Sequence, residues 1–104
     1  MKRILFALIS TLISLCSSAT DLVAQADSAY TSEDYRTAAK LYTRAIEEDG
    51  ASATVLYNLG NTYFRMGSIG KSILNYERAL KLNPSFKDAR TNLAHIHISE
   101  PTRQ

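Results

Sequence analysis

The sequence predicts an all-α fold: a solenoid of helical hairpins, with two hairpins and the first helix of a third, after an N-terminal signal segment. Three observations support it. Two separate blocks recur 34 residues apart, apolar residues within each period follow helical spacing, and glycine or proline stands where helices should end. The 104 residues, 45% apolar with only 4 Gly and 2 Pro, have the composition of a small helical domain.

Residues 1–26 are expected to be a secretory signal. Lys2 and Arg3 precede an apolar run from Ile4 to Leu15, whose 12 residues are fewer than the about 20 that a membrane span needs. We favour cleavage after Ala26, where the sequence reads A-x-A. Cleavage after Ala19 and retention as an uncleaved anchor are the alternatives. The segment predicts export to the periplasm or to the periplasmic face of the inner membrane.

The single cysteine, Cys16, follows this apolar run, so no disulfide can form within the chain. A lipoprotein cysteine needs a small residue before it, and here that residue is Leu15. We therefore expect Cys16 to be removed with the signal, with lipidation as the alternative.

The repeat is most visible in residues that recur 34 positions later. Tyr42 recurs as Tyr76, Ala45 recurs as Ala79, and the Asn-Leu-Gly segment at 58–60 recurs as Asn-Leu-Ala at 92–94. Two independent blocks that share one period indicate an array of equal structural units.

Turn residues separate the expected helices. Gly67 can adopt the left-handed conformation that ends a helix, and Ser68 can cap the next one. In the first unit Asp34 stands at the equivalent N-cap and Gly50 at a C-cap, while Pro84 ends the second hairpin.

This pattern resembles the tetratricopeptide repeat (TPR) family. Residues 53–86 match it almost throughout, residues 19–52 match it less well, and residues 87–98 match only its opening helix. The family's structural positions fall on Ala38, Tyr42, Ala45, Leu56, Leu59, Gly60, Tyr63, Gly67, Tyr76, Ala79 and Pro84.

The expected domain boundaries follow from this match. After the signal at 1–26 come a first repeat at 27–52 with a partial first helix, a second at 53–86, and the start of a third at 87–95. Residues 96–104 lack an apolar stripe, contain Pro101 and resemble the translation of a sequencing-library adapter. We interpret them as a non-native tail on a truncated chain.

No catalytic, cofactor or metal site is expected. No nucleophile stands with a partner base, and no phosphate loop surrounds the glycines. His95 and His97 are two residues apart and so point to different faces of a helix. A net charge of +2 without a basic block gives no reason to expect nucleic acid, and no small-molecule substrate is indicated.

The TPR resemblance implies protein binding in a concave groove lined by the first helix of each hairpin. It places the groove positions of the second repeat at Thr54, Tyr57, Asn58, Asn61, Phe64 and Arg65. Asn58 and Asn61 could bind a peptide backbone and Arg65 a carboxylate, although packing between repeats explains the two asparagines equally well.

A finer resemblance concerns residues 57–61 (YNLGN) and 75–80 (NYERAL). Together with the signal, they are similar to the TPR protein of the bacterial aerotolerance (Bat) operon family, which implies membrane-bound partners in the cell envelope. The expected function is a protein-binding scaffold of the envelope. The alternatives are the N-terminal accessory part of a longer envelope enzyme or transport-linked protein, and a self-associating array.

Overall fold

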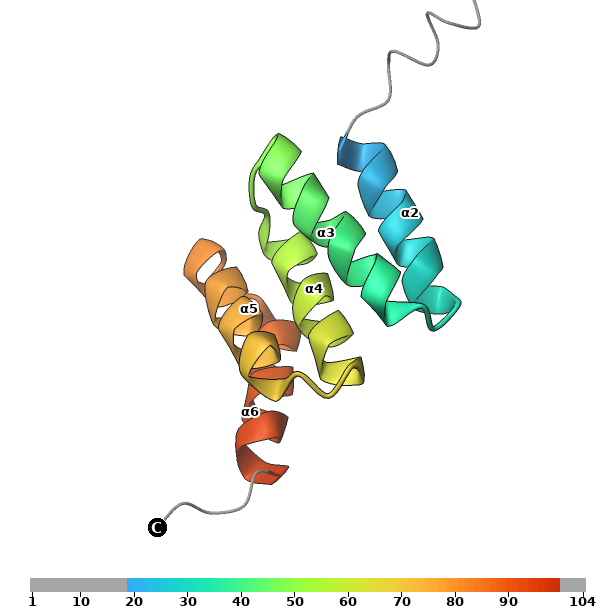
Figure 1. Ribbon diagram of the computed structural model, residues 1–104. Coiled ribbons are helices and arrows are strands. Elements are labelled where there is room, and N and C mark those ends of the chain that lie inside the picture. Colours follow the sequence, from blue (N-terminus) through green and yellow to red (C-terminus); the bar gives the residue numbers. More distant parts are fainter. Residues whose placement is uncertain (1–18, 100–104) are drawn as a thin grey trace, which may run out of the picture.

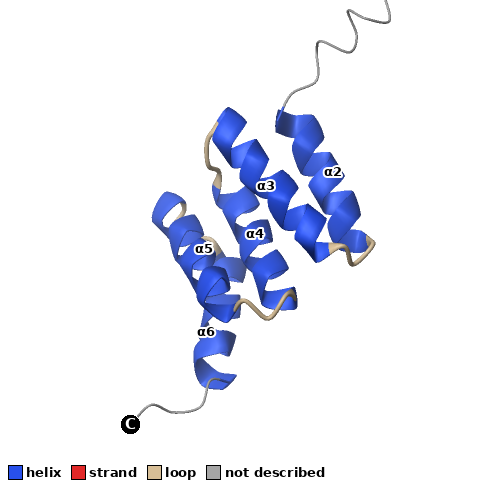
Figure 2. Ribbon diagram, viewed as in Figure 1, coloured by secondary structure: helices blue, strands red, loops and turns tan. Residues whose placement is uncertain are grey.

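The computed structural model describes residues 19–99, and its regular structure there consists of five α-helices without a strand. They are α2 (Ala19–Thr31), α3 (Tyr35–Asp49), α4 (Ala53–Arg65), α5 (Ile69–Leu82) and α6 (Lys87–Ser99). Each helix packs mainly against its neighbours in sequence, so α2–α3 and α4–α5 form two hairpins and α6 follows them (Figure 1; Figure 2). The predicted all-α solenoid of helical hairpins is confirmed.

Short polar connections set the helix ends. The Asp34 carboxylate and the Ser52 hydroxyl each accept a hydrogen bond from the backbone N–H three residues later, at the starts of α3 and α4. Ser68 stands at the N-cap of α5, but its side chain makes no capping bond. Gly50 and Gly67 have φ of 86° and 80°, a backbone region that favours glycine, and they turn the chain after α3 and α4.

Helix α2 differs from the expected partial helix of the first repeat. It has 13 residues, as many as α4, and it packs along α3. Leu22 and Ala26 are buried in this interface. The favoured boundary after Ala26 therefore falls in the middle of a packed helix, whereas Ala19 stands at its start. The residues from 1 to 18 lie outside the described part of the chain, and processing of the signal stays a prediction.

The core runs through both hairpins and joins them. One cluster includes Ala26 of α2, Tyr42 of α3 and Leu59 of α4. A second includes Leu56 of α4 and Tyr76 of α5, together with residues of α6. Small residues let the helices approach closely: a Cβ atom added to Gly60 would lie 2.7 Å from the Tyr76 ring.

Helix α6 extends beyond the expected end of the third repeat at residue 95. It continues to Ser99, and the Ile96 side chain is buried in the second core cluster beside Tyr76 and Ala89. The missing apolar stripe in residues 96–104 therefore does not mark the end of the helix, because Ile96 contributes a buried side chain there. Whether residues 96–104 are native stays a prediction, and residues 100–104 lie outside the described part.

Candidate binding groove

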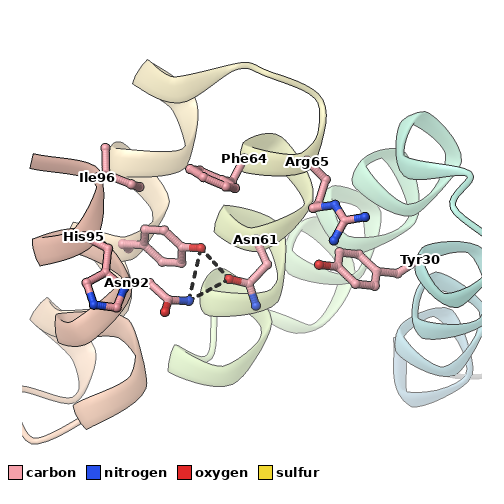
Figure 3. A pocket seen from close by; sticks show the side chains of 8 residues that line it. Tyr30, Asn61, Phe64, Arg65, Asn92, His95 and Ile96 are labelled. Atoms are coloured by element: carbon pink, nitrogen blue, oxygen red, sulfur yellow. Dashed lines mark hydrogen bonds between the residues drawn. The ribbon is translucent and has the colours of Figure 1, made fainter. Parts of the chain in front are cut away.

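A cavity of about 320 Å³ opens where the first helices of the successive hairpins face one side of the molecule. Side chains from α2, α4 and α6 point towards it (Figure 3), and Tyr76 of α5 also lines it. The lining residues are Tyr30, Asn61, Phe64, Arg65, Tyr76, Asn92, His95 and Ile96. Because α2, α4 and α6 all contribute, this cavity depends on all three first helices.

Asn61 lies at the centre of a hydrogen-bond network in this cavity. Its Oδ1 atom accepts from the Tyr76 hydroxyl of α5 and, at 3.1 Å, from Nδ2 of Asn92 on α6. The same Nδ2 group lies 3.2 Å from the Tyr57 hydroxyl and 3.4 Å from that of Tyr76. One amide oxygen thus connects three helices, which fixes the Asn61 side chain before any ligand arrives.

A second cavity of about 220 Å³ adjoins the first and shares Tyr30 and Asn61 with it. Its lining residues are Asp27, Tyr30, Thr31, Tyr42, Asn58 and Asn61. Here the Tyr42 hydroxyl donates to the Asp27 carboxylate. The two cavities together form what we call the groove, which runs from α2 across α4 to α6.

The hydroxyls of the two core tyrosines are protonated at neutral pH, and burial moves their pKa to still higher values. Burial raises the pKa of Tyr42, and the hydrogen bond to Asp27 raises it further. Burial also raises the pKa of Tyr76. Both hydroxyls are therefore permanent donors at neutral pH, and they determine which atoms of Asp27 and Asn61 remain available to a ligand.

Arg65, the last residue of α4, provides a positive charge beside Tyr30 on the α2 side of the groove. Its guanidinium lies 5.1 Å from the centre of the Tyr35 ring, a cation–π contact. Tyr30 packs edge-on against Tyr35, with ring centres 5.2 Å apart, and lies beside Arg65 in Figure 3. Burial raises the pKa of Tyr30, although the Arg65 charge opposes this.

Four of the six predicted groove residues line a cavity, and two do not. Asn58, Asn61, Phe64 and Arg65 line one or both cavities. Tyr57 lines neither; its ring packs against Phe86 and Tyr76. Thr54 is exposed at the beginning of α4 and also lines neither cavity.

Sequence reasoning missed the walls that come from outside the second repeat. Asp27 and Tyr30 are on α2, which was expected to be partial, and Asn92, His95 and Ile96 are on α6. The 34-residue period contains the missing signal: Asp27, Asn61 and His95 are spaced by that period and line the groove in turn.

The chemical groups that line the groove can hydrogen-bond and pack against a ligand. In the described residues, no three His, Cys, Asp or Glu side chains lie together where a metal ion could be held. The lining offers amide groups, hydroxyls, aromatic rings, one carboxylate and one guanidinium, which suit the backbone and side chains of a polypeptide. Within residues 19–99, no helix is long and apolar enough to cross a membrane.

Comparison with known proteins agrees with this geometry. Residues 53–86 match the family described as "Tetratricopeptide repeat". The chain is similar to a "Protein SGT1 homolog" of Oryza sativa subsp. japonica, with 30% identity over 86 residues. That alignment covers 81% of this chain but 23% of the relative, so the chain spans about a quarter of that protein's length. Residues 53–86, helices α4 and α5, are therefore a tetratricopeptide repeat within an array of helical hairpins.

Proposed function

We propose that this chain is a protein–protein interaction scaffold that holds a peptide or helix of a partner in the groove across α2, α4 and α6. The observation that carries the proposal is the pair of adjoining cavities on the side built by the first helices. Tetratricopeptide repeats in general bind other proteins, and solenoids do so on their concave surface.

The available atoms of the groove support a polypeptide ligand. Because Asn61 uses its Oδ1 atom inside the network, its Nδ2 group remains as a donor, and Asn92 likewise retains its Oδ1 acceptor. A peptide group offers one acceptor and one donor that can satisfy such a pair. Phe64, which is 45% exposed, adds an aromatic contact of the kind that anchors protein interfaces.

The groove can be tested with two matched pairs of substitutions. Phe64→Ala with Arg65→Ala removes an exposed apolar and a basic side chain from the groove. Leu74→Ala with Lys81→Ala removes the same two types from another surface, on α5. Proteins crosslinked to the full chain in envelope fractions should be lost with the first pair and retained with the second. If both double variants crosslink the same proteins equally well, the groove is not the binding site.

The proposed place of action is the bacterial cell envelope, beside membrane-bound partners. This rests on the signal features of residues 1–26 and on the similarity to the Bat operon protein. A fusion of the full chain to alkaline phosphatase, which is active only after export, tests it. Activity that depends on residues 1–18 is expected, and a cytoplasmic, inactive fusion would contradict the location.

A second candidate is an accessory role within a longer envelope enzyme or transport-linked protein. The observation that favours it is the share of the relative that is covered, 23%. The uninterrupted gene decides between the two: an additional domain with a catalytic or transport site supports the second candidate, and further hairpins alone support the first.

A further inference from the structure

Two charges of opposite sign lie in the groove without ionic partners. Asp27, in the second cavity, receives a hydrogen bond from the neutral Tyr42 hydroxyl. Arg65, in the first cavity, rests on the ring of Tyr35. The ion pair between Arg44 and Glu48 lies elsewhere, and no Lys, Arg, Asp or Glu among the described residues pairs with Asp27 or Arg65. Both charges are therefore available to a ligand.

The next repeat has an uncharged residue at the position equivalent to Asp27. Asn61 stands 34 residues after Asp27 and accepts the same tyrosine hydrogen bond without a charge. An amide oxygen at position 27 would also accept the Tyr42 hydrogen bond, although without the added strength of an ionised acceptor. The carboxylate thus adds a charge to the groove that the equivalent position of the next repeat lacks.

The contact with Tyr35 orients the Arg65 guanidinium so that it can bind an acidic group. A guanidinium that stacks on an aromatic ring keeps its edge available, and its planar set of donors fits a carboxylate in two parallel hydrogen bonds. Because the contact with Tyr35 limits the side chain's freedom, less conformational entropy is lost when the acid binds.

A ligand that crosses the groove covers both charges, because the two cavities share Tyr30 and Asn61 as their common wall. Covering an ion with an uncharged surface removes its water without replacement, which is unfavourable. From this charge complementarity we infer that the partner segment carries a basic side chain for Asp27 and an acidic side chain for Arg65. It also carries an apolar side chain to contact Phe64. This inference rests on the proposed function and specifies its ligand.

The two charges also give the groove a direction. A segment bound in the reverse orientation would place its acid against Asp27 and its base against Arg65, and both contacts would be repulsive. The partner is therefore bound in one orientation, with its basic group over the α2–α4 cavity and its acidic group towards the C-terminal end of α4.

A phage-displayed library of random dodecapeptides, panned on the full chain and its variants, tests the inference. Peptides selected on the unchanged protein should contain both a basic and an acidic residue. Asp27→Asn keeps the acceptor for Tyr42. Peptides selected on it should no longer be enriched in a basic residue but should still contain the acidic one. Peptides selected on Arg65→Gln should no longer be enriched in an acidic residue but should still contain the basic one. Glu77→Gln and Lys81→Gln, exposed on α5, are the matched controls and should change neither preference.

Binding constants of one selected peptide, measured by fluorescence anisotropy, complete the test. Replacing its acid by Gln should weaken binding roughly tenfold to the unchanged protein but little to Arg65→Gln, and the corresponding result should hold for its base and Asp27→Asn. Peptides that are selected without a charge preference, yet lose affinity in Phe64→Ala, would overturn the inference and leave the groove function standing. A library that yields no peptide sensitive to Phe64→Ala would overturn both.

Discussion

The hydroxyl of Tyr76 donates to Oδ1 of Asn61, and the same bond joins Tyr42 to Asp27 one repeat earlier. In each hairpin the tyrosine lies 15 residues after its acceptor and on the second helix, so the bond connects the two helices on the groove side. The structural repeat and the groove are therefore built from the same residues.

Gly60→Ala is expected to destabilise the protein by about 1–3 kcal/mol, because the new methyl group would meet the Tyr76 ring at 2.7 Å and that ring is buried. Gly70→Ala provides the matched control in α5, since a Cβ atom there meets nothing within 4 Å. It should be neutral or stabilise by up to about 1 kcal/mol. Urea unfolding followed by circular dichroism measures both, and equal effects would contradict the close approach of α4 and α5.

Removal of the Ser72 hydroxyl should stabilise the fold. Its Oγ atom is buried and makes no hydrogen bond of ordinary geometry, although the Tyr76 hydroxyl is a polar neighbour. Ser72→Ala is therefore expected to raise the free energy of unfolding by up to about 1 kcal/mol. Thr62→Val removes an equally buried hydroxyl that donates to the Asn58 carbonyl at 2.8 Å, and it should lower that free energy instead. The opposite signs of the two changes in the same unfolding experiment are the decisive result.

Alkaline pH should weaken the fold through the buried tyrosines. Burial raises the pKa of Tyr42 above its ordinary value of 10.0, so the unfolded chain loses this proton at a lower pH than the folded one. The stabilisation is complete below about pH 10 and declines as the pH rises further. Tyr42→Phe should flatten this decline while lowering stability at neutral pH, because its bond to Asp27 is lost. Parallel pH profiles for the two proteins would exclude Tyr42 as the cause.

Shortening the chain at its N-terminus tests how much of α2 the fold needs. A chain that begins at Asp27 lacks the buried side chains of Leu22 and Ala26 and should be about 3 kcal/mol or more less stable than one that begins at Thr20. Thermal unfolding of the two chains gives the comparison. If the signal is cleaved, N-terminal sequencing of the exported protein should find Thr20 first, because cleavage after Ala26 would divide a packed helix.

The sequence by itself determined the repeat and most of its helices. Its 34-residue period, the glycines of the turns and the spacing of Leu56, Leu59 and Tyr63 predicted α4 and α5, because these are local signals of helix periodicity and helix ends. The TPR resemblance, not the period itself, placed Asn58, Asn61, Phe64 and Arg65 in a groove, and these four side chains line the two cavities. It also placed Thr54 and Tyr57 there, and they line neither cavity.

Only the tertiary structure decided the limits of the array and the composition of the groove. In the sequence, Leu22 and Ala26 are consistent with a signal, but in the structure they are buried against α3. Ile96 belongs to no clear apolar stripe in the sequence, yet it packs beside Tyr76. The groove likewise needs Asp27 of α2 and Asn92 of α6 beside α4, an arrangement that no single helix encodes. The physical reason is that burial and hydrogen bonding between helices depend on neighbours distant in sequence, whereas periodicity and capping depend on residues a few positions apart.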